Sequence, residues 1–148
     1  MFAVPPRCCL PPLHAARFHP AGKDSAVTVG NKLLGDRGEA AAAAHLAKLG
    51  YEILARNLRT PYGELDLIAR RAGSTVFVEV KTRRSRTHGL PEEAVTLRKR
   101  KHLLASAEYY LQQREISDSP WRIDVVAVEF DSSGVIKRLE VFENAVHA

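Results

Sequence analysis

Two neighbouring stretches of the chain alternate between apolar and polar residues, as half-buried β-strands do. In the stretch 75–81 the valines fall on one face, whereas Glu79 and Lys81 fall on the other. The stretch 63–70 alternates in the same way, and Ala72-Gly73 between them fits a two-residue hairpin turn. The pattern predicts an antiparallel hairpin whose second strand carries two charges on one face.

Periodicity elsewhere predicts a helix and a strand before this hairpin, and a helix and two strands after it. Apolar residues recur at helical spacing over 38–49, ended by Gly50, and over 91–113, with Leu49 and Leu97 among those expected to be buried. Further strands are predicted at 51–57, 121–129 and 135–142. The order helix, three strands, helix, strand predicts an α/β fold with a mixed central sheet flanked by helices.

Two carboxylates meet in the predicted hairpin. In the register that the turn sets, Asp66 lies directly opposite Glu79 and projects from the same face. Like charges opposed across two strands are destabilising, so such a pair usually has a cation between its members. Oxygen ligands of this kind suit Mg²⁺ or Mn²⁺. The alternative is a register slipped by one residue, which would place the two acids on opposite faces.

Several motifs resemble known proteins. Asp66 followed by Glu79-Val80-Lys81 is similar to the PD-(D/E)xK motif of metal-dependent nucleases, a short pattern that also occurs by chance. Four longer runs together resemble the YraN family: GDRGE at 35–39, GELDLI at 63–68, VFVEVKTR at 76–83 and Arg98-Lys99. These small bacterial proteins are regarded as relatives of Holliday junction resolvases with a restriction-endonuclease-like fold. The resemblance covers roughly residues 31 to 148.

The resemblance implies a metal-dependent DNA endonuclease that acts on branched DNA as a homodimer. Asp66, Glu79 and the backbone carbonyl of Val80 would bind the Mg²⁺ or Mn²⁺ ion, which polarises the phosphoryl oxygen. Lys81 would orient the attacking water or neutralise charge that develops in the transition state.

Glu39 has two competing explanations. It lies in the first turn of the predicted first helix, where negative charge favours the helix dipole. It also lies beside the core-facing stripe, from which it would reach Asp66 and Glu79 as a further ligand or water-positioning group, as the corresponding acid does in resolvase-like relatives.

Basic residues gather around the predicted site. The chain has a net charge of +5, and residues 70–101 contain ten Lys and Arg against three Asp and Glu. This excess favours a polyanion such as nucleic acid as partner, although solvated basic loops are common. Residues 98–101 occupy a full helical turn, so at least one of them must point toward the sheet. The predicted nucleic-acid contacts are Arg83, Arg84, Arg86, Arg98, Lys99 and Lys101.

The chain divides into a proline-rich extension and one domain. Residues 1–30 contain five of the eight prolines and no apolar periodicity, which predicts disorder, and 31–148 form the nuclease-like domain. The composition of the extension also fits a transit peptide. Cys8 and Cys9 are adjacent and match no disulfide framework or zinc pattern, which suits the cytoplasm. No apolar run is long enough to span a membrane.

Two functions from different classes fit the sequence. The first is a structure-selective DNA endonuclease. The second is a nucleic-acid-binding or partner-recruiting protein that keeps the nuclease fold with little or no turnover. Nothing in the sequence distinguishes DNA from RNA, because no residue is evident that would test for a 2′-hydroxyl.

Overall fold

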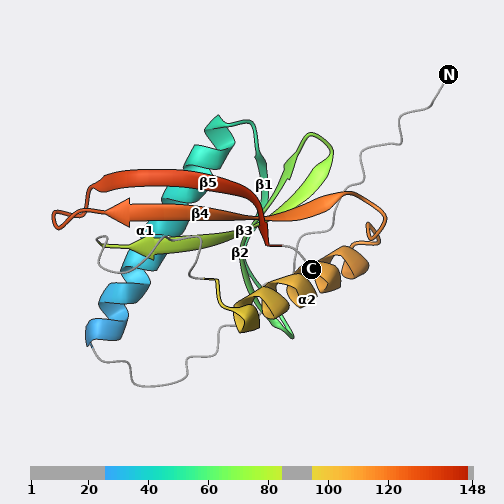
Figure 1. Ribbon diagram of the computed structural model, residues 1–148, viewed down its shortest axis with the longest axis horizontal. Helices are drawn as coiled ribbons and strands as arrows, with labels where there is room; N and C mark the ends of the chain where they lie inside the picture. Colours follow the sequence, from blue (N-terminus) through green and yellow to red (C-terminus); the bar gives the residue numbers. More distant parts are fainter. Residues whose placement is uncertain (1–25, 85–94, 147–148) are drawn as a thin grey trace.

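A five-stranded mixed sheet forms the centre of the protein (Figure 1). The computed structural model describes residues 26–84 and 95–146. The strands lie in the order of the sequence, and β3 and β4 are the parallel pair. The predicted α/β architecture and order of elements are confirmed. The elements are α1 (Ala26–Lys48), β1 (Glu52–Thr60), β2 (Gly63–Arg71), β3 (Ser74–Arg83), α2 (Leu97–Gln113), β4 (Trp121–Phe130) and β5 (Ile136–Val146).

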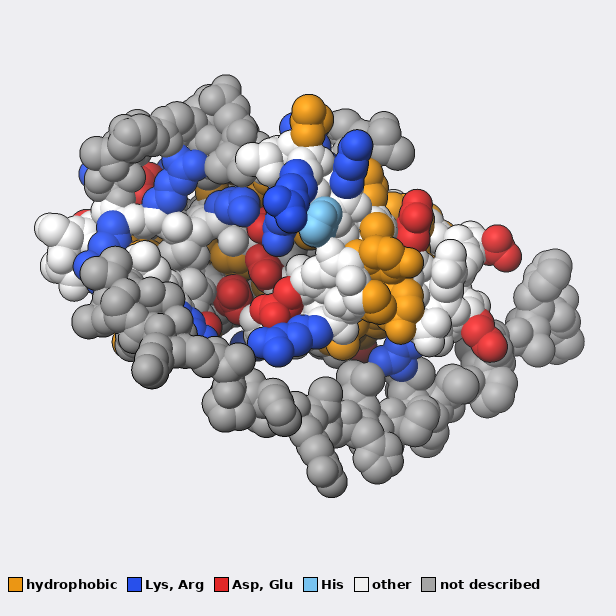
Figure 2. Space-filling model, turned by 90° about the horizontal axis from the view of Figure 1, so that it is seen from below, with side chains coloured by type: hydrophobic (Ala, Val, Ile, Leu, Met, Phe, Trp, Pro, Cys, Tyr) orange, Lys and Arg blue, Asp and Glu red, His pale blue; other side chains and the backbone are white. Residues whose placement is uncertain are grey.

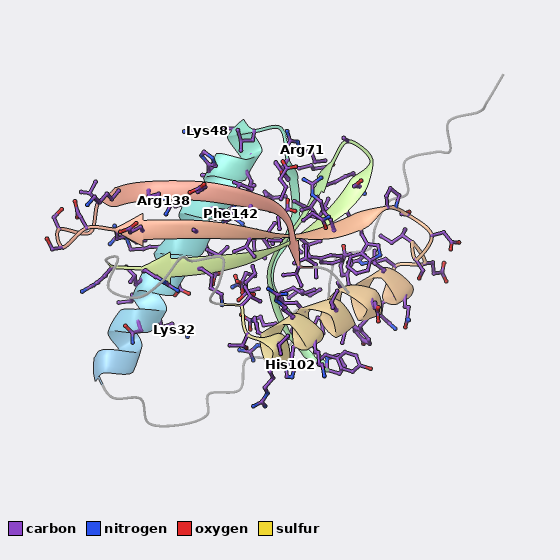
Figure 3. The ribbon with its side chains drawn as sticks, viewed as in Figure 1. Lys32, Lys48, Arg71, His102, Arg138 and Phe142 are labelled. Carbon is purple, nitrogen blue, oxygen red and sulfur yellow. The ribbon has the colours of Figure 1, made fainter. Side chains whose placement is uncertain are left out.

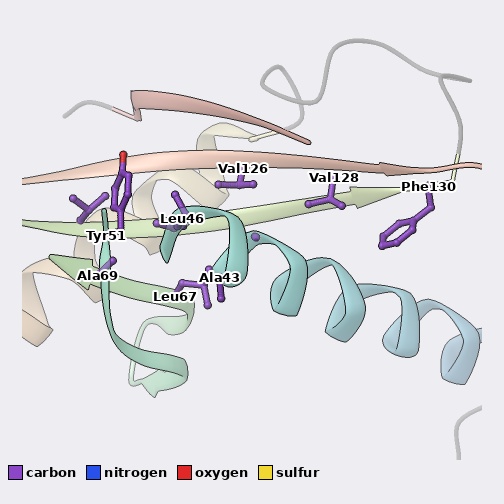
Figure 4. Packing of buried hydrophobic residues seen from close by; sticks show 11 residues of the cluster. Ala43, Leu46, Tyr51, Leu67, Ala69, Val126, Val128 and Phe130 are labelled. Atoms are coloured by element: carbon purple, nitrogen blue, oxygen red, sulfur yellow. The ribbon is translucent and has the colours of Figure 1, made fainter. Parts of the chain in front are cut away.

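The two helices cover opposite faces of the sheet, and each seals its own apolar cluster. Under α1, Leu46 packs against Val78 and Val126 in the cluster of Figure 4. Under α2, Phe77 contacts Tyr110 edge-on with ring centroids 5.6 Å apart. Alternation along β3 therefore divides its side chains between two cores, as the period of two predicts. Neither described helix combines the length and apolar character needed to cross a membrane.

The predicted turn and helix end are confirmed by the backbone. Ala72 and Gly73 both have positive φ, at 49° and 80°, as the two central residues of a type I′ hairpin require. Gly50 has φ of 87°, and the Tyr51 amide donates to the Leu46 carbonyl at 3.0 Å, which is the Schellman arrangement.

Both helices begin elsewhere than the sequence pattern predicts. α1 begins at Ala26, well before residue 38. Residues 30–33 of the helix are exposed, so this part of it has no buried stripe that a sequence pattern would reveal. The helix therefore crosses the predicted boundary at residue 30, and residues 1–25 lie outside the described part of the chain. α2 begins at Leu97, where Thr96 caps it by accepting the Lys99 amide at 3.2 Å.

Other predicted details are also wrong. Leu49 follows the end of α1 and Leu97 begins α2, so both side chains face solvent, with exposed fractions of 46% and 77%. β1 extends to Thr60 through residues that the pattern assigned to a loop, because Pro61 and Tyr62 alone form the turn into β2. β5 likewise continues to Val146, beyond its predicted end at 142.

The β1–β2 hairpin changes direction at one point. Leu65 and Ile68 both pack under α2, although strict alternation would place residues three apart on opposite faces. Their ladder partners on β1, Leu58 and Ala55, also both pack under α2 although they are three residues apart. Asn57 lies between these two residues and has a left-handed φ of 49°. Asp66 lies between Leu65 and Ile68 on β2. The bend therefore brings Asn57 and Asp66 to the same place in the fold.

Candidate functional site

The predicted register of the β2–β3 hairpin is confirmed. The ladder pairs run from Arg71 and Ser74 to Leu67 and Val78, so Asp66 and Glu79 follow at the next position. There the Asp66 carboxylate accepts the backbone amide of Val80 at 2.8 Å. The slipped register, which would separate the acids, is excluded.

Glu79 is a buried carboxylate with two lysine partners. Its side chain is 4% exposed, and its Oε1 lies 2.8 Å from the Lys81 ammonium. Its Oε2 lies 3.2 Å from the Lys99 ammonium on α2 but accepts no hydrogen bond. One of the four basic residues at the start of α2 thus points toward the sheet, as predicted. The two acids do not depend on a cation alone, because two ammonium groups already neutralise Glu79.

The surroundings of Asp66 shift the pKa of its carboxyl group. Burial, and then the charge of Glu79, raise the pKa of Asp66 to about 7, while the Val80 amide and Lys99 oppose the rise. Glu39 raises it further, so its charge acts on Asp66 from α1. Near neutral pH about half of the Asp66 side chains would carry a proton.

Glu39 is held in place by a residue that the sequence analysis missed. Asn57 Nδ2 donates to Glu39 Oε2 at 2.5 Å. The helix-dipole explanation loses its basis, because α1 begins at Ala26 and Glu39 is not in its first turn. The sequence carried only a weak signal for this role of Asn57. Asparagine tolerates positive φ better than most residues, and Asn57 lies across the hairpin from Asp66.

Helix α1 approaches β3 closely beside Glu39. A Cβ added to Gly38 would lie 2.0 Å from Thr82 Oγ1, so any side chain there would displace the helix or the strand. Glycine in the GDRGE run thus allows α1 to bring the next residue, Glu39, to the acid pair.

Basic side chains surround the acids on one face of the molecule. Figure 2 shows acidic side chains in the middle of this face, with lysine and arginine side chains around them. Arg84, Arg98 and Lys101 are exposed, whereas Lys99 points inward to Glu79. Arg83 lies at the end of β3, half-buried. Arg86 lies outside the described residues, and phosphate binding by this set remains a prediction.

The donor set fits Mg²⁺ better than a metal that needs many protein ligands. Within residues 26–84 and 95–146, no group of three or more His, Cys, Asp or Glu could hold a metal ion. Mg²⁺ is commonly bound by one or two carboxylates and retains several waters. Asp66 and Glu79 supply that number, and the Val80 carbonyl would be the third protein oxygen. The Glu79 Oε2, which is ion-paired with Lys99 and accepts no hydrogen bond, is the oxygen that a cation would use.

A second charged cluster lies on the α1 face and is internally satisfied. Asp124 on β4 is fully buried and accepts hydrogen bonds from Arg122 Nε at 2.9 Å and from the Asn144 amide at 2.8 Å. The Tyr51 hydroxyl accepts from Arg122 and Arg71, and the Arg71 guanidinium stacks over the Tyr51 ring. Arg122 and Asp124 therefore form a structural ion pair.

Comparison with known proteins identifies the family. A sequence model of the uncharacterised protein family UPF0102 matches residues 38–128, a range that includes the acids, both lysines and Asn57. The chain belongs to UPF0102. This confirms the resemblance to YraN proteins.

UPF0102 relatives match over most of their own length. A UPF0102 protein of Caldicellulosiruptor saccharolyticus is 44% identical over 76% of this chain and 95% of its own. One of Symbiobacterium thermophilum is 47% identical over 80% of this chain and 99% of its own. None of these names states an activity.

One solved structure is distantly similar. Pyrococcus furiosus SfsA in complex with Ca²⁺ matches with a TM-score of 0.38 and 16% identity, over 80% of this chain and 65% of that chain. Similarity at this level carries no functional argument, so function must be argued from the site itself.

Proposed function

We propose that this UPF0102 protein is a metal-dependent DNA endonuclease with a restriction-endonuclease-like core, selective for branched DNA. The observation that carries the proposal is the convergence of Asp66 and Glu79 from adjacent strands, with a buried Glu79 oxygen that accepts no hydrogen bond. That oxygen is ion-paired with Lys99 at 3.2 Å, whereas the buried acceptors of a structural cluster are usually hydrogen-bonded as well.

Each residue of the site has a role in phosphodiester hydrolysis. A bound Mg²⁺ or Mn²⁺ ion would supply Lewis-acid activation of the phosphate and of water. Asp66, Glu79 and the Val80 carbonyl would bind that ion. Lys81 lies beside Glu79 and would neutralise negative charge that develops on the phosphoryl oxygens. Glu39, oriented by Asn57, would position the attacking water.

The surrounding basic surface would bind the DNA backbone. Arg84, Arg98 and Lys101 are exposed near the acids, and the N-terminus of α2 adds its own partial positive charge. Contacts of this kind give affinity that falls with salt and carry little sequence information. Selectivity would therefore rest on the shape of the DNA, and a homodimer would present two such sites to a junction.

The second candidate is a DNA-binding protein of the same fold without turnover. It is favoured by the two ion pairs of Glu79, since Lys81 and Lys99 already occupy the carboxylate that a cation would need. The two candidates differ in whether branched DNA is cut when Mg²⁺ or Mn²⁺ is supplied.

The test is incubation with linear, flapped and four-way DNA, with Mg²⁺, with Mn²⁺ and with a chelator. We expect cleavage of branched DNA that needs the ion and falls on the order of 10³-fold in Asp66→Asn and in Glu79→Gln. DNA affinity should be kept or improved in both variants, because each removes negative charge.

Glu108→Gln is the matched control, since it removes an exposed acid from α2 and should cleave normally. Cleavage that survives in Asp66→Asn or Glu79→Gln would disprove the site assignment. Tight binding of branched DNA without cleavage in either metal would support the second candidate.

A further inference from the structure

The tip of the β1–β2 hairpin presents an aromatic side chain to solvent. Tyr62, in the turn between the two strands, is 51% exposed. It is the one aromatic residue among the exposed large apolar side chains of the described ranges. An exposed tyrosine in a turn contributes little to the core, so one face of its ring is available to a ligand.

The hairpin tip is fixed to α2. Thr60 Oγ1 lies 2.8 Å from Ser106 Oγ on the helix and accepts the Tyr62 amide at 3.1 Å. A Cβ on Gly63 would lie 3.7 Å from Ser106 Oγ, so the turn already touches the helix. The Tyr62 ring meets Tyr109 of α2 edge-on, with centroids 6.1 Å apart. Tyr62 is thus exposed but supported, and binding a ligand would cost it little conformational entropy.

One side of α2 connects this tyrosine to the acid pair. Lys99 reaches Glu79, Ser106 contacts the hairpin tip, and Tyr109 supports Tyr62, at spacings that keep them on neighbouring parts of one helix surface. At 1.5 Å per residue, Lys99 and Tyr109 are separated by about 15 Å along the helix. The stacking distance between bases in a strand is about 3.4 Å, so this span corresponds to roughly four nucleotides.

The surface along this side carries positive charge at its Lys99 end. Arg98 and His102 are exposed there, and Figure 3 labels His102 on α2. The His102 side chain lies beside the hairpin tip, since a Cβ added to Gly63 would be 3.9 Å from His102 Cβ. A basic surface that ends in a supported aromatic ring has the two components of single-strand binding, which are charge for the phosphates and a ring for the bases.

We propose that Tyr62 is a stacking platform for an unpaired base of the DNA, about four nucleotides from the phosphate at the acid pair. The proposal rests on the nuclease function above and gives the structural feature of branched DNA that the protein selects. In a continuous duplex every base is already stacked on its neighbours, so Tyr62 would gain little. At a flap or a junction an unpaired base is available, and the ring would stabilise it.

The test uses the full-length chain with Asp66→Asn, which prevents cleavage. Flapped duplexes of both polarities carry 2-aminopurine at successive positions, and a blunt duplex of equal length is the reference. We expect fluorescence quenching at one flap position, about four nucleotides from the phosphate that the wild-type chain cuts. Tyr62→Ala should abolish the quenching and weaken flap binding about tenfold while leaving duplex binding unchanged.

Two control variants separate stacking from charge and from folding. Tyr62→Phe keeps the ring and should bind flaps as the parent does. Arg98→Ala should weaken flaps and duplexes alike and reduce the salt dependence of binding by about one charge, whereas Tyr62→Ala should leave that dependence unchanged. Thermal unfolding of Tyr62→Ala should match the parent, because the side chain is exposed.

The outcomes distinguish this inference from the proposed function. Equal affinity of Tyr62→Ala and parent for flaps overturns the stacking platform, and so does equal weakening of flaps and duplexes. If the wild-type chain cleaves branched DNA in either of these cases, the nuclease proposal stands without the stacking platform. If the parent binds no DNA, both proposals are wrong.

Discussion

The protein contains two clusters around buried carboxylates, and they differ in how their charges are satisfied. Asp124 on β4 accepts four hydrogen bonds, from two Arg122 nitrogens, the Asn144 amide and the Tyr51 hydroxyl. Glu79 on the adjacent strand has two lysine partners, but one oxygen accepts no hydrogen bond and a second acid is close by. The first cluster is electrostatically complete, whereas the second retains unfavourable interactions.

The difference separates a cluster that stabilises the fold from the one to which we assign the proposed chemistry. Complete hydrogen bonding of a buried charge offsets its desolvation, so Asp124 joins the start of β4 to the end of β5. The site around Glu79 keeps two acids close together and raises the pKa of one. Groups with perturbed protonation concentrate at functional sites. Amide substitutions at the two positions should therefore affect different properties.

The largest effect on stability is expected at the complete cluster. Asp124→Asn leaves Arg122 without its buried partner and should lower the free energy of unfolding by about 3 kcal/mol. Glu79→Gln should change it by less than about 1 kcal/mol, because both lysines are partly exposed and can turn to water. Urea unfolding measures both values, and a larger loss in Glu79→Gln would reverse the assignment of the two clusters.

The next effect is on pH dependence. Because the pKa of Asp66 is raised in the folded state, the native protein binds this proton more tightly than the unfolded chain does. The ionisation of Asp66 therefore lowers the free energy of unfolding as pH rises from about 4 to about 7.

Asp66→Asn should remove this decline and be more stable than the parent above pH 7, by on the order of a few kcal/mol. Chemical unfolding across this pH range, in chelator, measures the difference. The same amide substitution at the exposed Asp118 should leave the pH profile unchanged. Parallel profiles for Asp66→Asn and the parent would show that Asp66 is not destabilised in the fold.

The smallest effect tests whether Glu39 belongs to the site. Asn57→Gly retains the left-handed backbone but loses the hydrogen bond to Glu39, and it should weaken Mn²⁺ binding about tenfold. Calorimetric titration of the DNA-free protein measures this affinity. Asn57→Ala should also lower stability by about 1 kcal/mol, because alanine is strained at positive φ. Unchanged Mn²⁺ affinity in Asn57→Gly would show that Asn57 serves the backbone of the hairpin and not the metal site.

Local patterns were enough to predict the acid pair. The period of two in β2 and β3 assigns each side chain to a face, and a two-residue turn leaves one register, which brings Asp66 opposite Glu79. Four consecutive basic residues on a helix required that one point inward, and Lys99 does. These inferences need only sequence-local geometry.

The remaining features depend on tertiary structure. The role of Asn57 arises from a bend where both strands of the hairpin leave strict alternation, and periodicity assumes that alternation. Residues 30–33 of α1 are exposed, so no apolar stripe marks this part of the helix in the sequence. The position of Tyr62 against Tyr109 depends on the angle at which α2 crosses the sheet. Spacing along the chain carries little information about any of these.

The two ammonium groups beside Glu79 have a consequence for how the protein would be kept in the cell. They act as internal counterions, so the domain does not need to acquire a divalent ion in order to fold, in contrast to small metal-dependent domains that unfold when chelated. Under the proposed function, the supply of the ion would control catalysis by a domain that is already folded, and a chelator would remove the ion without unfolding the domain.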